Sequence, residues 1–453
     1  MRKIFAFMIL SIAIIGCGHF VSAPTVEPDP ACQIYKEEKE RRTAIEFTRD
    51  SAYIINYLSD FYKNLTVEQI SAWEKSKALE GLTINGQKMY FRNAGRNLFR
   101  IDKEAKALYD SLMHPAKDTE DAFLDTYLPQ VVSKGRNSGS SLIMPVRYKI
   151  GYKLTVKPDQ VPAGEIVRAW MPYPRQDQDS QTDIELLSAS EANYVISSDD
   201  VAHKSIYMEK TAVAGQPTVF TYEVAFTVAN EWYDFKPSDV KPYDTASELY
   251  KTYTSERAPH CVFSPKIRRI ADSLTNGISN PFLKVKAIYS YIVDTYPWAS
   301  ARDYSTLDNI PEYVIDNVHG DCGQVGLLLV NLCRAAGIPA RWQSGWMLHP
   351  DAVNMHDWSE IYYEGIGWVP TDVSFGRGRD KETNDEDVYN YYLHGLDAFR
   401  WIVNSDYSRL FSPAKNFTRS DIVDFQRGEV EWQGGNLYFD QWSGWISSIE
   451  YVE

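Results

Sequence analysis

One segment, residues 319–339, constrains the fold of this chain more than any other. Apolar residues at positions 325, 328, 329 and 332 recur at the spacing of one buried helix face, Gly337 suits a C-terminal cap and Pro339 blocks continuation. The spacing therefore predicts a helix that opens on Cys322. Unpaired backbone N–H groups and the helix dipole favour a thiolate at that end, and the thiolate is the nucleophilic form of cysteine. Cys322 is our candidate nucleophile.

A candidate base and a carboxylate to orient it follow in a predicted hairpin over residues 355–372. A hairpin with its turn near the middle of this segment sets His356 and Asp372 directly opposite each other, and a slip of about one residue leaves them neighbours. This pairing would fix the imidazole tautomer and leave the other ring nitrogen facing the thiol. Cys322, His356 and Asp372 are thus a candidate catalytic triad. Asp357 should point to the opposite face of the strand, so we leave it out of the triad.

Several motifs together resemble the transglutaminase-like core of the papain-like thiol enzymes. These motifs are Gly320-Asp321-Cys322-Gly323, Cys333-Arg334-Ala335-Ala336-Gly337-Ile338-Pro339-Ala340-Arg341, Gly345-Trp346, His356-Asp357-Trp358 and Gly367-Trp368-Val369-Pro370-Thr371-Asp372. The resemblance implies a Cys-His-Asp triad on Cys322, His356 and Asp372, and a cysteine helix packed on an antiparallel sheet. Residues 84–99 and 426–432 also look like a bacterial lipoprotein subgroup of this superfamily.

Aromatic residues near the triad are candidates for the oxyanion site and the substrate groove. In the family, an aromatic residue often lies near the oxyanion site, and Tyr296 and Trp298 stand at that place before the cysteine. Trp346 and Trp358 either line a substrate groove or fill the core of the sheet. The backbone N–H of Cys322 is a further candidate for the oxyanion site, because it is present at the helix terminus anyway.

The first residues predict export. Arg2 and Lys3 precede an apolar run that is too short to span a bilayer, so residues 1–16 are predicted to be a signal peptide. The run ends in a lipobox-like Gly-Cys junction, which implies lipid attachment at Cys17; the alternative is an ordinary signal peptide with an incidental cysteine. Residues 17–30 are predicted to be a flexible tether. We expect a membrane-anchored lipoprotein on the periplasmic or cell-surface side.

The charge and the cysteine content of the chain limit the binding partners, disulfides and metal sites that we expect. The net charge is −14, and removal of residues 1–16 takes away two basic side chains and no acidic one, which leaves −16. Such an acidic chain argues against nucleic acid as a partner. Cys32 and Cys261 could form a disulfide outside the cytoplasm, while Cys333 is expected to be a buried apolar residue. The histidines near His356 show no known ligand spacing, so we predict no metal site and no cofactor.

The order of predicted elements gives the α+β class and three domains. Residues 31–135 show helical periodicity and are predicted to form a helical domain. Residues 142–240 alternate and are rich in β-branched residues, which predicts a β-sandwich. Residues 242–453 are predicted to form the transglutaminase-like (papain-like) catalytic domain, with an aromatic C-terminal extension that packs over it.

Three functions are compatible with these residues. The first is a cysteine peptidase or amidase, an acyl-transfer enzyme that hydrolyses peptide, protein or cell-wall peptide substrates through the triad. The second is a protein-glutamine transglutaminase, in which an amine replaces water as the acceptor. The third is a non-catalytic surface protein that binds peptide or glycan. We expect a monomer in each case.

Overall fold

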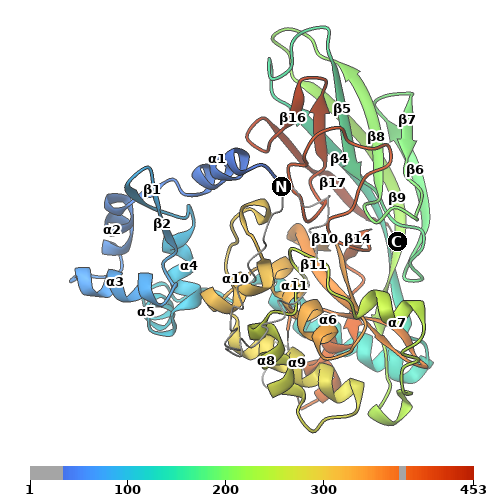
Figure 1. The fold of residues 1–453 in the computed structure, drawn as a ribbon. Helices are drawn as coiled ribbons and strands as arrows, with labels where there is room; N and C mark the ends of the chain where they lie inside the picture. Colours follow the sequence, from blue (N-terminus) through green and yellow to red (C-terminus); the bar gives the residue numbers. More distant parts are fainter. Residues whose placement is uncertain (1–33, 377–383, 453) are drawn as a thin grey trace, which may run out of the picture.

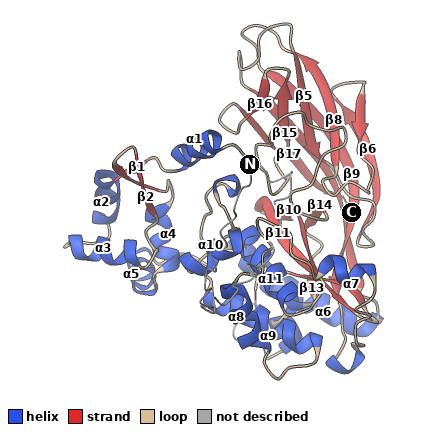
Figure 2. Cartoon of the chain, in the orientation of Figure 1, coloured by secondary structure: helices blue, strands red, loops and turns tan. Residues whose placement is uncertain are grey.

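The computed structural model describes residues 34–376 and 384–452, and it has the predicted α+β class (Figure 2). The elements form three units: an N-terminal unit, a sandwich of two sheets, and a sheet covered by helices. Cys322 lies on one of the helices of the third unit. In the part of the chain described, no helix has both the length and the apolar character needed to cross a membrane.

The N-terminal region is mostly helical and contains one small sheet. Its elements are α1 (Lys36–Glu46), β1 (Arg49–Asp50), α2 (Ser51–Ser59), α3 (Val67–Lys75), β2 (Gly81–Ile84), β3 (Gln87–Tyr90), α4 (Ala94–Ile101), α5 (Lys103–Met113) and α6 (Thr119–Ser138). The strands pair in the order β1-β3-β2. Asn85 and Gly86 have φ of 50° and 78°, which suits a tight turn between β2 and β3. Helices α2 to α5 lie to one side of the molecule, away from the sandwich (Figure 1).

Helix α6 belongs with the rest of the molecule rather than with α2 to α5. Its apolar side chains Leu124, Leu128 and Val131 share a buried cluster with Trp232 and Tyr391. The helix runs through Ser138, which is three residues beyond the predicted end of the helical domain at residue 135. The first turn of α6 also reaches the Cys322 region, where Glu120 lies 3.0 Å from His349 in the sheet of that region.

The sandwich is completed by the C-terminus of the chain. Its strands are β4 (Leu142–Val156), β5 (Ile166–Pro172), β6 (Gln181–Ala189), β7 (Tyr194–Ile196), β8 (Ser205–Thr211), β9 (Thr218–Trp232), β13 (Gly395–Leu396), β15 (Glu429–Trp432), β16 (Gly435–Leu437) and β17 (Trp442–Val452). One sheet has the order β13-β9-β4-β17, with β6 also on β9, and the other has the order β16-β15-β5-β8-β7. The C-terminal strands therefore join both sheets of the sandwich, instead of only covering the catalytic region as expected.

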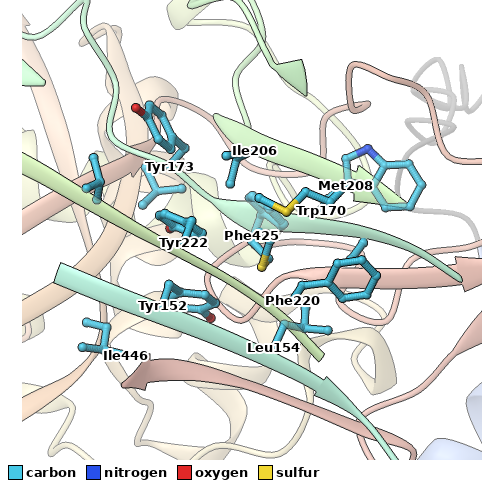
Figure 3. Close-up of a cluster of buried hydrophobic side chains, with 14 of the residues drawn as sticks. Tyr152, Leu154, Trp170, Tyr173, Ile206, Met208, Phe220, Tyr222, Phe425 and Ile446 are labelled. Carbon is cyan, nitrogen blue, oxygen red and sulfur yellow. The ribbon is translucent and has the colours of Figure 1, made fainter. Parts of the chain in front are cut away.

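The core of the sandwich shows the same mixture of early and late residues. Tyr152 and Tyr222 from the long central strands face Phe425 and Ile446 from the C-terminal part of the chain (Figure 3). Burial of large side chains is the main favourable term in folding, so this shared core ties residues 142–232 to the C-terminus.

The Cys322 region follows the sandwich in the chain. Its elements are η2 (Pro237–Asp239), α7 (Glu248–Tyr253), α8 (Pro265–Thr275), α9 (Pro281–Thr295), η3 (Tyr304–Thr306), α10 (Ile310–Asn317), α11 (Cys322–Ala335), β10 (Ala340–His349), β11 (Ala352–Tyr363), β12 (Gly367–Thr371), α12 (Glu386–Tyr389), η4 (Tyr391–Leu393) and β14 (Arg400–Asn404). The antiparallel sheet has the order β12-β11-β10-β14. Helix α11 packs on this sheet and lies among α8, α9 and α10 (Figure 1). Residues 323–334 are all buried, so α11 is a central helix with no solvent face.

Candidate functional site

Helix α11 begins at Cys322, as the sequence predicts. The Asp321 side chain accepts a hydrogen bond from the backbone N–H of Gln324 (3.0 Å), and the Gln324 side chain accepts one from the N–H of Asp321 (3.2 Å). This reciprocal capping fixes the first turn and uses two of the N–H groups that a helix terminus leaves without partners. The sulfur of Cys322 is therefore held at a well-defined helix end.

The group in contact with this sulfur is Asp357. Cys322 Sγ donates a hydrogen bond to Asp357 Oδ2 at 3.2 Å. The expected neighbour was His356, and Asp357 was expected to lie on the far side of the strand from the nucleophile. The structure corrects this expectation, because it places Asp357 and not His356 at the thiol.

The correction follows from which face of β11 the helix covers. Ser359, which has the same parity as Asp357, donates a hydrogen bond from its hydroxyl to the carbonyl of Gly326 in α11 (3.3 Å). Ile361 and Tyr363 continue this face and pack in one cluster with apolar side chains of α11. Side chains alternate across a strand, so His356 lies on the opposite face.

A close approach at Gly323 keeps the helix end against this face. A Cβ atom at Gly323 would clash with the Tyr304 hydroxyl, and it would lie 2.8 Å from Asp357 Oδ2 and 2.8 Å from the indole of Trp342. Glycine is therefore needed directly after the cysteine for Cys322 to reach Asp357.

His356 and Asp372 do meet, on the other face of β11. His356 Nε2 lies 2.7 Å from Asp372 Oδ2. The strand register pairs Ser359 with Thr371, so Asp372 is two residues away from the predicted position directly opposite His356. The contact forms because Asp372 follows the last residue of β12 and its side chain reaches back to the ring. Two pairs result: Cys322 with Asp357, and His356 with Asp372.

The His356–Asp372 pair continues into a buried network of charges. Arg400 Nη2 lies 3.4 Å from Asp372 Oδ2 and 2.9 Å from Asp397 Oδ2. His349 in turn lies 2.9 Å from Asp397 and 3.0 Å from Glu120 of α6. Burial alone would lower the pKa of His349, but Asp397 and Glu120 raise it above its ordinary value. Each buried carboxylate here thus has a cationic partner.

Cys322 opens into a cavity of about 440 Å³. The walls come from the N-terminal region (Glu46, Arg92), from the Cys322 region (Trp298, Asp303, Tyr304, Asp321, Asp357) and from the C-terminal part (Asp421, Asp424, Arg427, Tyr438, Phe439). Among the described residues that line this cavity, neither His356 nor Asp372 is found. The cavity is large enough for part of a peptide.

The electrostatics around the sulfur oppose a thiolate in this conformation. Burial, together with the Asp357 and Asp321 carboxyl groups, raises the pKa of the Cys322 thiol well above its ordinary value. Burial also raises the pKa of Asp321 to about 6. Burial and the nearby Asp424 raise the pKa of Asp357 well above its usual range. The helix dipole predicts a more acidic thiol, and this local acidic environment outweighs it.

The four aromatic candidates fall into two groups, one residue on the cavity wall and three in the buried core. Trp298 is 45% exposed and lies on the cavity wall. Tyr296 is buried, and its hydroxyl pairs with that of Tyr291. Trp346 and Trp358 are fully buried in the core, where their indole N–H groups donate to Gln426 and Gln343. For Tyr296, Trp346 and Trp358 the structure thus corrects the groove interpretation, since none of the three belongs to the cavity wall.

The remaining predicted residues have these places. Cys333 is fully buried, as expected, and Cys261 is buried with its sulfur 3.6 Å from Asn331 Oδ1. Cys17 and Cys32, the predicted lipidation site and disulfide partner, lie outside the described residues, as does the predicted signal peptide. Within residues 34–376 and 384–452, no three His, Cys, Asp or Glu side chains converge as a metal site would require.

Sequence reasoning missed most of the cavity wall, including Glu46 and Asp424. Asp424 follows β14 by twenty residues and Glu46 ends α1, and no motif links either residue to Cys322. The sequence did contain a signal for Asp357, because alternation along the strand places its side chain on the opposite face from that of His356. What the alternation leaves undetermined is which face receives α11, since both faces of β11 are buried.

Comparison with known proteins finds one segment of the chain that matches a protein family. Residues 268–373 match the model of the transglutaminase-like superfamily. The uncharacterised protein YebA of Bacillus subtilis strain 168 is 28% identical over 134 residues, which cover 24% of this chain and 18% of YebA. The chain thus spans less than a fifth of the length of that relative.

Two solved structures are similar to the chain at low identity. A candidate cysteine protease from Cytophaga hutchinsonii is 14% identical with a TM-score of 0.45, over 68% of this chain and 92% of that one. The periplasmic domain of TgpA from Pseudomonas aeruginosa is 17% identical with a TM-score of 0.28, over 54% and 91%. The family match alone supports a thiol enzyme in general. Residues 268–373, which run from α8 through β12 and contain Cys322 and His356, are a transglutaminase-like domain.

Proposed function

We propose that this chain is a thiol enzyme that transfers acyl groups at peptide or amide bonds through Cys322, with water as the favoured acceptor. The observation that carries the proposal is the place of Cys322, which opens a buried helix on the wall of a 440 Å³ cavity. The helix terminus supplies backbone N–H groups for the oxyanion, beginning with that of Cys322. The match of residues 268–373 to the transglutaminase-like superfamily supports the same chemistry.

In the proposed reaction, Cys322 Sγ attacks the carbonyl carbon and the thiol proton passes to a base. The base returns the proton to the leaving amine, and water then hydrolyses the acyl-enzyme. We assign the base to His356 and its orientation to Asp372, whose 2.7 Å contact supports the assignment.

The described conformation is, in this proposal, a resting state. The thiol proton points to Asp357, and His356 lies on the other face of the same strand. The two residues are neighbours in sequence, and a local shift of β11 by one residue exchanges the faces of its side chains. Such a shift would bring the imidazole to the sulfur and release Asp357, and the Asp372 side chain would have to follow the ring in order to keep orienting it.

We further propose that the enzyme is exported and anchored by lipid at Cys17, acts as a monomer, and meets peptide, protein or cell-wall peptide substrates outside the cytoplasm. The apolar run before Cys17 supports this placement. Substitution Cys17→Ala should release the protein from the membrane fraction and remove the mass of the lipid. Retention in that fraction would contradict the anchor.

The test of the enzyme assignment is covalent labelling. A peptide-based thiol electrophile should modify Cys322, as mapped by mass spectrometry, and Cys322→Ala should abolish both labelling and turnover. Cys333→Ala is the matched control and should change neither, because Cys333 is buried. Labelling that persists in Cys322→Ala at Cys333 alone would overturn the assignment.

The acceptor is decided in the same experiment by the products. Peptide, glutamine-donor and cell-wall peptide substrates are incubated with and without a primary amine. Hydrolysed products support the peptidase or amidase, whereas amine-linked products support the transglutaminase.

The raised pKa of Cys322 favours a second candidate, a non-catalytic peptide-binding or glycan-binding protein. A thiol that stays protonated is a poor nucleophile. Saturable peptide binding without any labelling or turnover would select this function over the enzyme.

A further inference from the structure

A second cavity, of about 200 Å³, lies in the N-terminal region, where β1, α2 and the start of α4 meet. Its wall includes Arg49, Arg92 and Arg96 and the aromatic residues Tyr53 and Tyr57. None of the described residues on this wall is acidic. The chain as a whole has a net charge of −14, so this basic cavity is a local exception. A cavity lined by one sign of charge concentrates ligands of the opposite sign, which here are anions.

The three arginines keep N–H groups that a ligand can reach. Arg96 is exposed, and among the described residues it pairs with no carboxylate. The Arg92 side chain is 46% exposed, and its Nη1 lies 3.0 Å from Glu46 Oε1. A guanidinium has five N–H groups, so this single contact leaves others for a ligand. Arg49 stacks on Tyr53, with its guanidinium carbon 4.3 Å from the ring centroid. Planar guanidinium groups match the geometry of a carboxylate.

The aromatic part of the wall is fixed by packing within the N-terminal region. A Cβ atom at Gly95 would lie 2.6 Å from the ring of Tyr57, so the absence of a side chain lets this ring lie against the first turn of α4. The rings of Tyr57 and Tyr53 are parallel within 2°, with centroids 6.5 Å apart. The cavity is therefore shaped before a ligand binds, which lowers the entropic cost of binding.

Helix α4 connects this second cavity to the cavity of Cys322. Arg92, just before the helix, belongs to the walls of both cavities. Asn97 donates to the carbonyl of Ser300 (2.9 Å) and accepts from its N–H (3.0 Å). Arg100 stacks on Trp298, which lines the Cys322 cavity. The helix lies on the side of the N-terminal region that faces the Cys322 region (Figure 1). A peptide in the Cys322 cavity that passes Arg92 therefore enters the second cavity.

The Cys322 cavity determines which part of such a peptide carries an acidic group. Asp321, Asp357 and Asp424 belong to its wall, and burial raises the pKa of each of them. A further carboxylate beside them would have no cation near it. An acidic group is therefore disfavoured next to the sulfur and favoured on the far side of Arg92.

We propose that the second cavity binds a carboxylate carried by the acyl donor, with Arg49, Arg92 and Arg96 as its hydrogen-bond donors. The inference rests on the proposed function of Cys322, since the acyl donor is the molecule that this sulfur attacks. It adds a substrate class: the preferred peptide bears an acidic group a few residues away from the bond that is cleaved. The N-terminal region is then part of the substrate-binding surface.

The test begins with binding to the full chain carrying Cys322→Ala, which separates recognition from turnover. Short peptides with blocked ends and an otherwise neutral sequence contain glutamate or glutamine at one position, and this position is moved along the peptide. At the best position, the glutamate peptide should bind at least about fivefold more tightly than its glutamine partner, as expected for charged hydrogen bonds. A smaller difference at every position, or no measurable binding, would overturn the proposal.

Substitution then assigns the donors. Arg49→Gln with Arg96→Gln should bring the Kd values of the two peptides within about twofold of each other. Arg96→Gln alone, at an exposed position, should reduce the preference by about half and decides the matter if the double variant does not fold. Arg269→Gln removes the same charge from an exposed position of α8 and should leave the preference intact. Circular dichroism and thermal melting verify folding. A preference that survives in the folded variants would overturn the assignment.

A membrane is the other anionic partner that this basic cavity could meet. Protein carrying Cys17→Ala is sedimented with vesicles of phosphatidylcholine and phosphatidylglycerol in equal amounts. We expect no sedimentation that depends on Arg49 and Arg96. Vesicle binding that the double substitution abolishes, without a preference for the glutamate peptide, would assign the cavity to lipid headgroups and overturn the proposal.

Turnover of the same peptides by the unsubstituted protein separates this inference from the proposed function. The glutamate peptide should be cleaved with a kcat/KM at least about fivefold higher than that of its glutamine partner. Glutamate-selective binding without labelling or turnover at Cys322 would refute the enzyme, and with it the acyl donor. Turnover without a preference for glutamate would refute only this inference.

Discussion

The two faces of strand β11 handle buried charge in opposite ways. On the face away from α11, Asp372 and Asp397 share Arg400, and His349 adds a second cationic partner. On the face toward α11, Asp357 lies against the thiol of Cys322 and beside Asp424. Within the described residues, neither Asp357 nor Asp424 forms an ion pair.

The pKa values follow this difference. Arg400 and His349 hold the pKa of Asp397 well below its usual range in spite of burial. On the other face burial raises the pKa of both Asp357 and Asp424. A buried carboxylate with its own guanidinium is part of the scaffold, whereas an unbalanced one beside a cavity is prepared for a proton or a ligand. The described conformation therefore separates the thiol and the unbalanced carboxylates on the α11 side from His356 and Asp372, the assigned base and its orienting group, on the other.

The largest expected effect tests which face supplies the base. His356→Ala should lower kcat by about 10²–10⁴, the usual contribution of a general base. Asp357→Asn should lower kcat by less than tenfold, because in our proposal Asp357 holds the thiol only at rest. Steady-state kinetics on one peptide substrate measures both. Loss of activity in Asp357→Asn with full activity in His356→Ala would transfer the role of base to Asp357.

The next effect concerns the scaffold face. Arg400→Met should lower the free energy of unfolding by about 3–5 kcal/mol, since it removes the guanidinium that the buried Asp372 and Asp397 share. Urea denaturation monitored by tryptophan fluorescence measures the loss. A loss below about 1 kcal/mol would show that these carboxylates do not need Arg400, and the contrast between the faces would fail.

A smaller effect tests the close approach of α11 to Asp357. Gly323→Ala should lower the free energy of unfolding by about 1–3 kcal/mol, because its Cβ would clash with the Tyr304 hydroxyl and would lie 2.8 Å from Asp357 Oδ2 and from Trp342. Gly326→Ala is the matched control on the same helix. Its Cβ would meet Ser359 and Trp342 at 3.7 Å, an ordinary contact, so the variant should be neutral or slightly more stable. Equal effects of the two variants would contradict the described contact.

The smallest effect is a pH dependence from the cavity wall. Burial, with Asp303 and Asp424 nearby, raises the pKa of Asp421 to about 7 from an ordinary value of 3.8. The folded protein therefore binds an extra proton between these values, and the stability that the proton confers is present below pH 4 and lost as pH rises through 7.

Asp421→Asn removes this titration. Relative to the variant, the unsubstituted protein should lose about 1 kcal/mol of unfolding free energy between pH 5 and pH 8, a value reduced for the partial exposure of Asp421. Denaturant titrations at the two pH values measure it. If the free energy of unfolding of the unsubstituted protein, relative to that of Asp421→Asn, stays constant or increases with pH, the raised pKa is contradicted.

Local patterns in the sequence predict much of this arrangement. The helix that opens on Cys322 and the β11–β12 hairpin both rest on residues close in sequence, and both form. The contact of His356 with Asp372 also forms, since a hairpin keeps its two strands together even when the register shifts by two residues.

The parts that sequence did not predict depend on distant segments. The pairing of β17 with β4 joins residues almost three hundred apart, and alternation along either strand does not indicate its partner. The placement of Asp357 at the sulfur depends on which buried face of β11 receives α11. Glu46 and Asp424 reach the cavity only through the packing of the two ends of the chain on the Cys322 region.

The most direct measurement is the rate at which iodoacetamide alkylates Cys322 as a function of pH, in the unsubstituted protein and in Asp357→Asn. Mass spectrometry quantifies modification at this residue alone. With the thiol donating to a carboxyl group, the inflection of the unsubstituted protein should lie above pH 9, and Asp357→Asn should lower it by about one unit or more. An inflection below pH 7 that Asp357→Asn leaves unchanged would show a Cys322 thiolate already paired with an imidazolium, and would contradict the account.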